Sequence, residues 1–134
     1  MKIEELYLYP CRGIPGIKVD SLHLGEYGIM HDRIFAIINT ENLFPMSGTN
    51  FPEISTLRQR IEGDTLILSS LFPERLTTAG LATELRLNMV TFNTDERVEC
   101  MKRHTGFKCA AHMNLWVTTA VKKDAFLIRS SDDR

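Results

Sequence analysis

The sequence has few cysteines, no long apolar run and no excess of charge. Three cysteines with no Cys-x-x-Cys pair argue against a disulfide framework and favour reduced thiols. A formal net charge of −1 argues against a binder of duplex nucleic acid, which usually carries a basic excess. No segment has the roughly 20 apolar residues of a membrane-spanning helix, and Glu4 and Glu5 interrupt the region where a signal peptide is apolar. We therefore expect a cytoplasmic protein that binds neither membrane nor nucleic acid.

Motifs of self-sufficient enzymes are also missing. The sequence contains no nucleophile elbow, phosphate-binding loop or dinucleotide fingerprint. It has no internal repeat and no low-complexity tract. Its 134 residues suit one domain that buries a sizeable core. We therefore expect a single domain over 1–134 without catalytic residues of its own.

Short runs of strand-forming residues, separated by turns, fill the first part of the chain. Residues 3–9, 17–24 and 33–39 are predicted strands. The turns between them fall at 11–16 and 25–28, where glycine and proline concentrate. The third run is almost wholly apolar or β-branched, which is typical of a strand buried on both faces.

The second part of the chain gives further strand signals. Two runs over 55–70 meet at Glu62-Gly63-Asp64 and predict a hairpin. Residues 71–78 are predicted to be loop and short strand. Residues 84–92 and 96–101 are predicted to pair with each other, because Asn93-Thr94-Asp95 suggests a turn between them.

One helix is predicted at about 110–122. Five apolar residues share a helical face at i, i+3, i+4, i+7 and i+8, namely Met113, Trp116, Val117, Ala120 and Val121. The β-branched run within this segment favours a strand instead, but Lys122 and Lys123 suit a helix C-terminus. With a final short strand at 125–130, the pattern predicts a mainly β fold. We expect a curled antiparallel sheet, barrel-like, with the helix packed on one end.

Asp32 and Arg33 stand directly before the predicted buried strand. An unpaired buried charge is costly, so the two residues must neutralise each other, remain in water or meet an anion. The residues alone leave all three alternatives open.

Three stretches in order resemble one family. Residues 5–35 contain a Tyr-Pro turn and an Asp-Arg entry to a strand, and residues 51–69 resemble the family's Pro-x-Leu segment and the hairpin that follows it. Residues 109–134 place a Cys before a Trp-containing helix and a Leu-Ile-Arg strand. Together they resemble the MOSC N-terminal β-barrel domain. Members of that family usually continue into a MOSC half that holds a molybdenum-ligating cysteine, and we expect that catalytic half to be absent here.

The resemblance implies a site for the anionic molybdenum cofactor, molybdopterin, at Arg12, Gly13 and Arg33. Arginine suits such a ligand because it grips phosphate bidentately. If Arg12 and Arg33 line one barrel mouth, the glycine turns 13–16 and 25–28 should lie side by side. The family's lysine and serine are Arg12 and Gly13 here, and an arginine of the family pattern is Thr49.

Two functions follow from the resemblance. The chain either contributes cofactor binding to a molybdenum-dependent reductase or sulfurtransferase whose MOSC catalytic domain is supplied in trans, or it is a freestanding, non-catalytic binding or regulatory module. The oligomeric state and any other protein partner are not readable from the sequence.

A second set of residues has the composition of a zinc site. Cys100, His104, Cys109 and His112 supply two thiols and two imidazoles, the count of a closed tetrahedral site. Their Cys-x3-His-x4-Cys-x2-His spacing matches no standard zinc motif, and core cysteines with surface histidines explain them better. We therefore expect no metal site.

Overall fold

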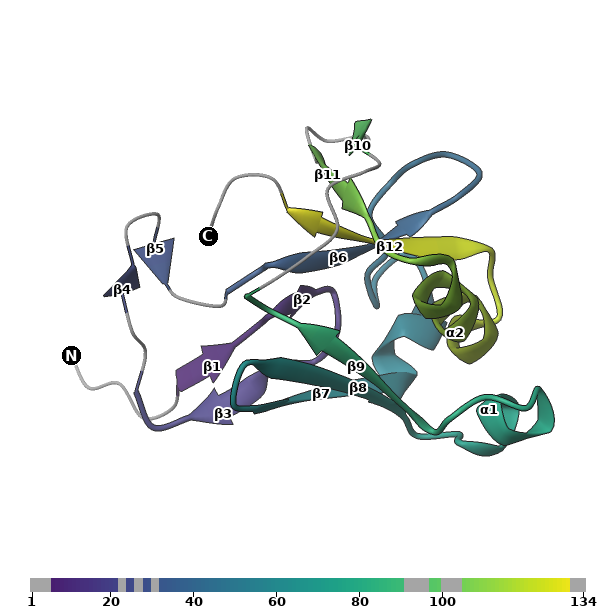
Figure 1. Cartoon of the computed structure of the whole chain (residues 1–134), viewed down its shortest axis with the longest axis horizontal. Coiled ribbons are helices and arrows are strands. Elements are labelled where there is room, and N and C mark those ends of the chain that lie inside the picture. Colours follow the sequence, from purple (N-terminus) through teal and green to yellow (C-terminus); the bar gives the residue numbers. More distant parts are fainter. Residues whose placement is uncertain are drawn as a thin grey trace.

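The computed structural model describes residues 6–21, 24–25, 28–29, 32–90, 97–99 and 105–130. The described strands form four sheets around one main core (Figure 1). Among these residues, no helix is long and apolar enough to cross a membrane.

The largest sheet has five strands in the order β10-β11-β12-β6-β2. A three-stranded sheet, β7-β8-β9, packs below it in Figure 1, and β1-β3 and β4-β5 are two-stranded. The strands are β1 Leu6–Leu8, β2 Cys11–Arg12, β3 Ile17–Val19, β4 Leu24–Gly25, β5 Gly28–Ile29, β6 Phe35–Asn39, β7 Leu57–Glu62, β8 Thr65–Ser70, β9 Glu84–Asn88, β10 Arg97–Glu99, β11 Thr105–Lys108 and β12 Ala125–Ser130. The helices are a 3-10 turn at Pro52–Thr56, α1 at Glu74–Thr78 and α2 at Ala111–Val121.

Strand β6 is buried on both faces, as predicted. Phe35 and Ile37 enter the main core between the two larger sheets. Ala36 and Ile38 point to the opposite face, where they join Phe126 and Ile128 of β12 in a second apolar cluster. The alternation follows from the period of two along a strand. The apolar run of β6 therefore contributes side chains both to the main core and to the second apolar cluster.

The predicted helix is confirmed as α2. Trp116, Val117, Ala120 and Val121 are all buried in the main core. Trp116 donates its indole N–H to Ala82 O at 2.9 Å, so its polar atom is satisfied. The threonines that argued for a strand have local partners, since Thr119 donates to Leu115 O at 2.8 Å.

Two predictions for 71–101 are wrong. Residues 74–78 form the short helix α1, which begins after Pro73, carries Glu74 in its first turn and ends before Gly80 at φ +76°. These are ordinary helix boundary signals. Strand β9 pairs with β8, whereas β10 pairs with β11 in the other sheet. A local turn signal therefore gave the wrong partner for both strands.

The hairpin β7–β8 and the final strand β12 are confirmed. The predicted strand at 17–24 is divided between β3 and β4, and Cys11 and Arg12, predicted as turn, form β2. Among the described strand pairs, β2–β6 alone is parallel. Among the described residues the sheets curl around the core without closing into a continuous barrel.

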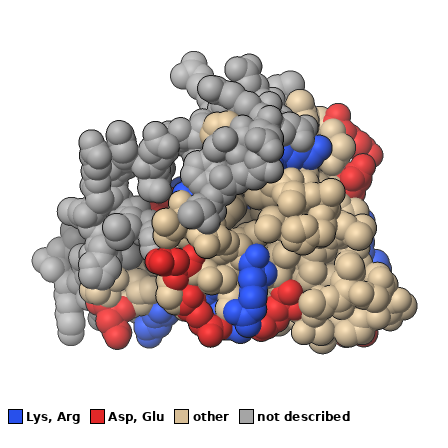
Figure 2. Space-filling view, viewed as in Figure 1, with Lys and Arg blue, Asp and Glu red and all other residues tan. Residues whose placement is uncertain are grey.

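Charge is distributed unevenly over the surface. Figure 2 shows acidic and basic side chains along the lower edge, and a largely uncharged surface on the right, over α1 and α2. The sequence of α2 contains no Asp, Glu, Lys or Arg. On the β7–β9 sheet, Arg60 contacts Glu84 at 2.6 Å and Glu62 at 3.1 Å. In register, Ile67 lies between Arg60 and Arg86, whose aliphatic stems can cover this fully buried side chain.

Candidate anion site at the end of strand β2

Strand β2 occupies only part of the β6 edge. Cys11 and Arg12 pair with Phe35 and Ala36. Beyond that point Met46 N donates to Ile37 O at 2.8 Å, and Asn39 N donates to Phe44 O at 2.9 Å. The segment 44–46 therefore continues the edge where β2 leaves it, and Arg12 lies at the junction.

Gly13 makes this junction possible. Its φ is +91°, and a Cβ at this position would lie 2.5 Å from Met46 O and 3.3 Å from Ser47 Cα. A side chain would require the backbone to move, and it would also be strained at this φ. Gly13 therefore has a packing role at this junction, which a residue with a side chain would disturb.

The loop that follows Met46 brings polar groups to the same place. Ser47 N donates to Asn50 Oδ1 at 2.8 Å, and Ser47 Oγ donates to the same atom at 3.1 Å. Phe51 N donates to Ser47 O at 2.8 Å and closes the turn. Thr49 is exposed on this loop, as is Arg12 on its strand. The structure thus places Gly13, next to Arg12, against the start of a Ser47–Asn50 loop. Sequence reasoning named Thr49 of this loop and did not name Ser47.

Arg33 lies at the other end of β2. Its backbone N donates to Tyr9 O at 2.7 Å, and its guanidinium lies 5.6 Å from the Tyr9 ring centroid. Its side chain pairs with Asp32, whose Oδ1 accepts from Tyr9 N at 3.1 Å. Arg33 has φ +52° and a half-exposed side chain, whereas Asp32 is largely buried. The pair therefore neutralises itself and ties the start of β6 to Tyr9.

The structure separates the predicted residues into two groups. In register, Arg12 stands beside Ala36 and Arg33 beside Tyr9, so their backbones are three strand positions, roughly 10 Å, apart. Figure 1 shows the β4–β5 hairpin at the left end of the molecule and the β2–β3 connection on the other side of β1. The described ends of the 25–28 turn, in β4 and β5, therefore do not lie beside the 13–16 turn, contrary to the prediction.

The described cysteines are poor nucleophiles. Burial, with a smaller effect of nearby Cys109, raises the pKa of the Cys11 thiol well above its usual range. Burial also raises the pKa of Cys109 to about 11, against a smaller lowering by Arg129. Both thiols are protonated at neutral pH, and thiolate is the reactive and metal-ligating form.

The structure describes two of the four residues in the zinc hypothesis. Cys100 and His104 lie outside the described residues. Cys109 is partly buried at the start of α2, and His112 is exposed on its first turn. Within the described part of the chain no group of three or more metal-ligating side chains comes together. The expectation that the protein binds no zinc stays a prediction.

Comparisons with known proteins give a family and a fold. The model of the MOSC N-terminal beta barrel domain matches residues 1–124. None of the curated proteins matches the chain. The solution structure of a structural genomics target from Bordetella bronchiseptica is similar, with a TM-score of 0.56 and 11% identity over 82% of this chain and 86% of that chain. The match to the family model covers most of the sequence, and the chain belongs to the MOSC N-terminal beta barrel domain family.

Proposed function

We propose that this domain is a non-catalytic, anion-binding module that holds the phosphate end of a pterin-type molybdenum cofactor at Arg12. The observation that carries the proposal is the junction at the end of β2, where Gly13, the neighbour of Arg12, lies against the backbone of Met46 and Ser47. Arg12 and Thr49 are exposed, and Ser47 is partly buried beside Gly13.

The donors at this edge fit a phosphate and do not fit a metal. Guanidinium and hydroxyl groups donate hydrogen bonds to phosphate oxygens. The resemblance places the molybdenum-ligating cysteine in the MOSC half, and both described thiols of this domain are buried with raised pKa values. When bound, the cofactor would supply the redox chemistry. The residues of this chain would only hold and orient its anionic end.

Each residue has a separate part in the proposal. Arg12 makes the charge-assisted contacts, which contribute about 1.5–3 kcal/mol each. Gly13 sets the approach of Arg12 to the Ser47–Asn50 loop. Arg33 adds positive charge from the other end of β2, and its pairing with Asp32 reduces this contribution.

Backbone amide shifts during titration with inorganic phosphate, and then with a phosphate-bearing pterin, test the site. The amides of Arg12, Gly13 and Ser47 should move together. Arg12→Met should weaken binding at least tenfold, and the effect should shrink at high salt. Arg86→Met on the exposed face of β9 is the matched control and should change little. The proposal would be wrong if the amide shifts were confined to residues outside Arg12, Gly13 and Ser47. It would also be wrong if no amide shifted at millimolar ligand.

The catalytic half is proposed to come from another chain that contains a MOSC domain. The alternative is a freestanding binding or regulatory module, which the protonated state of both described thiols also permits. Purification from the native cell, followed by molybdenum and pterin analysis, separates the two. Co-purification of a MOSC protein with both components supports the first, and a cofactor-free protein in its absence supports the second.

A further inference from the structure

Arg58 is an exposed residue near the start of β7, and hydrogen bonds to the backbone fix its guanidinium. Its Nη1 donates to Ser55 O at 2.6 Å and to Leu57 O at 2.8 Å. These two bonds use both protons of Nη1 and set the plane of the group. Nε and Nη2 donate to no acceptor in the part of the chain that the structure describes. The guanidinium therefore presents an open edge with two parallel donors, the arrangement that binds phosphate bidentately.

The charge of Arg58 is not neutralised within the described structure. Arg60, two residues further along the same face of β7, pairs with Glu84 at 2.6 Å and with Glu62 at 3.1 Å. Arg58 has no carboxylate within ion-pair distance among the described residues, and its two contacts are with neutral carbonyl groups. An anion that binds Arg58 therefore displaces no internal partner, whereas one that binds Arg60 competes with two glutamates.

The residue that holds Arg58 also contacts the Ser47–Asn50 loop. A Cβ at Gly48 would lie 3.7 Å from Ser55 Cβ, which is an ordinary packing distance. The start of the same loop lies against Gly13. The loop therefore connects the end of β2 with the segment that positions the Arg58 guanidinium.

A second connection between these strands runs through Gln59, the next residue of β7. Its side chain accepts from Cys11 N at 2.8 Å and donates to Cys11 O at 3.3 Å. Gln59 and Cys11 are buried, while the neighbouring Arg58 and Arg12 are exposed, as expected from the alternation along a strand. The bridge therefore joins two short segments that each present an arginine to solvent.

We propose that Arg58 is a second anion-contacting residue of the Ser47–Asn50 loop and that its Nε–Nη2 edge binds a phosphate group. The inference rests on the proposed function in taking the ligand to be a phosphate. Gly48 N and Thr49 N, which donate to no acceptor in the described structure, add backbone donors on the exposed part of the loop. Arginine edges and backbone N–H groups are the donors that phosphate oxygens usually meet in proteins.

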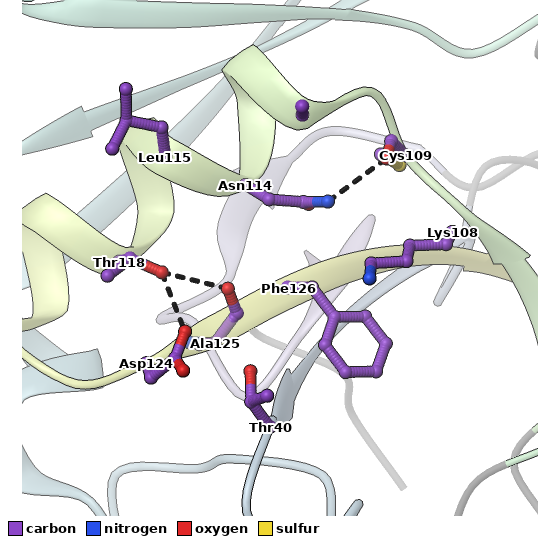
Figure 3. Close-up of a pocket in the computed structure, with 10 residues that line it drawn as sticks. Thr40, Lys108, Cys109, Asn114, Leu115, Thr118, Asp124, Ala125 and Phe126 are labelled. Atoms are coloured by element: carbon purple, nitrogen blue, oxygen red, sulfur yellow. Dashed lines mark hydrogen bonds between the residues drawn. The ribbon is translucent and has the colours of Figure 1, made fainter.

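The groove of about 410 Å³ between α2 and β12 provides an internal reference (Figure 3). Asn114 accepts from Leu127 N at 2.9 Å. Thr118 accepts from Ala125 N at 3.1 Å and donates to Ala125 O at 2.9 Å. The polar side chains of the helix wall are thus engaged within the protein, and the groove shares no residue with segment 47–58. Its amides should not respond to phosphate.

Titration of the labelled full chain with inorganic phosphate tests the inference when side-chain Nε–H signals are followed together with the amides. The Arg58 Nε–H signal and the Gly48 amide should shift together and saturate at millimolar phosphate, the weak end of specific binding. The Arg60 Nε–H signal and the Thr118 amide should stay in place. These readouts come from the unaltered protein, so they do not depend on the folding of any variant.

Substitutions measure the contribution of the two-donor edge. Arg58→Met should weaken phosphate binding at least about fivefold. Arg58→Lys should restore only part of the affinity, because an ammonium keeps the charge but lacks the planar fork. Arg60→Met is the matched control, since it removes the same charge from the same face of β7. Its affinity should stay within about twofold of the original, because solvent and salt screen the more distant charge.

A stationary Arg58 Nε–H signal during saturable binding would overturn the inference, and so would an Arg58→Met variant that binds phosphate as tightly as the original chain. In both cases a loss of binding in Arg12→Met would leave the proposed function standing. If Arg58→Met weakens binding and Arg12→Met does not, the inference holds and the assignment of Arg12 is wrong. Equal shifts of the Thr118 and Gly48 amides would mean that phosphate binds without specificity, which would overturn both.

Discussion

The side chain of Gln59 forms hydrogen bonds with the backbone N–H and C=O of Cys11, as a neighbouring strand would. Its Oε1 accepts from Cys11 N at 2.8 Å, and its Nε2 donates to Cys11 O at 3.3 Å, across 48 positions of sequence. The same Nε2 donates to Pro15 O at 3.0 Å. Gln59 is buried on β7, so one side chain joins the three-stranded sheet to β2 and the turn that follows it.

Gln59→Leu should destabilise the fold by about 2–4 kcal/mol, because it leaves several buried backbone groups without partners. Gln59→Glu keeps an acceptor for Cys11 N but faces the carbonyl oxygens with a buried carboxylate. Burial raises the pKa of that carboxyl in the folded state, so this variant should gain stability as the pH falls through that pKa. Urea unfolding at neutral and mildly acidic pH measures both effects. A Leu variant as stable as the original chain would contradict the bridging role.

Gly13→Ala tests the junction at the end of β2. The added Cβ meets Met46 O at 2.5 Å as well as an unfavourable φ of +91°. Gly80→Ala is the matched control, since Gly80 has φ +76° but nothing within 4 Å of a Cβ. The control should lose about 1 kcal/mol from backbone strain alone. The Gly13 variant should lose at least about twice that amount. Chemical denaturation measures the free energy of unfolding of both variants. If Gly13→Ala and Gly80→Ala lost equal stability, the backbone near Met46 O would move away from the new Cβ at no cost.

Lys122→Gly should stabilise the protein. Lys122 ends α2 in the left-handed conformation at φ 57°, and its side chain is exposed. Glycine adopts this conformation without the Cβ penalty, so a gain of about 1 kcal/mol is expected. Lys122→Ala removes the charge but keeps the penalty, and it should not give the gain. Thermal unfolding of both variants decides between a conformational and an electrostatic effect.

The pair of Arg60 and Glu84 should make stability depend on acid pH. The hydrogen bond from Arg60 is the main cause that lowers the pKa of Glu84 in the folded protein. The stabilisation from a lowered carboxyl pKa is present above the unfolded pKa and is lost as the pH falls through the folded one. Glu84→Gln should therefore lower the melting temperature near neutrality and converge with the original chain in acid. A difference that stays constant through the acid range would rule out this pair as its source.

Local sequence patterns predicted the secondary-structure elements better than they predicted which strands pair. The face of Trp116 and Val117 identified α2, and the turn at Gly63 identified its hairpin, because neighbours in sequence fix both. The partner of β9 depends on β8 and the core below it, which the local turn signal near Asn93 could not reveal. The residues of the candidate site were found through family resemblance. Their grouping, with Gly13 beside Ser47 and Arg33 beside Tyr9, depends on how two segments share the β6 edge.

The pairing of Asp32 and Arg33 can be separated from anion binding by a graded series. Asp32→Asn retains an oxygen for Tyr9 N but weakens the contact with Arg33, whose side chain is 50% exposed. It should cost less than about 1 kcal/mol, because solvent screens the pair. Asp32→Ala also removes the acceptor for Tyr9 N and should cost about 1–2 kcal/mol more. If the pair is structural, phosphate affinity at Arg12 should stay unchanged in Asp32→Asn while stability falls. If freeing Arg33 instead tightens phosphate binding several-fold, then Arg33 belongs to the anion site and Asp32 restrains it. Chemical denaturation and phosphate titration of the same two variants give both readouts.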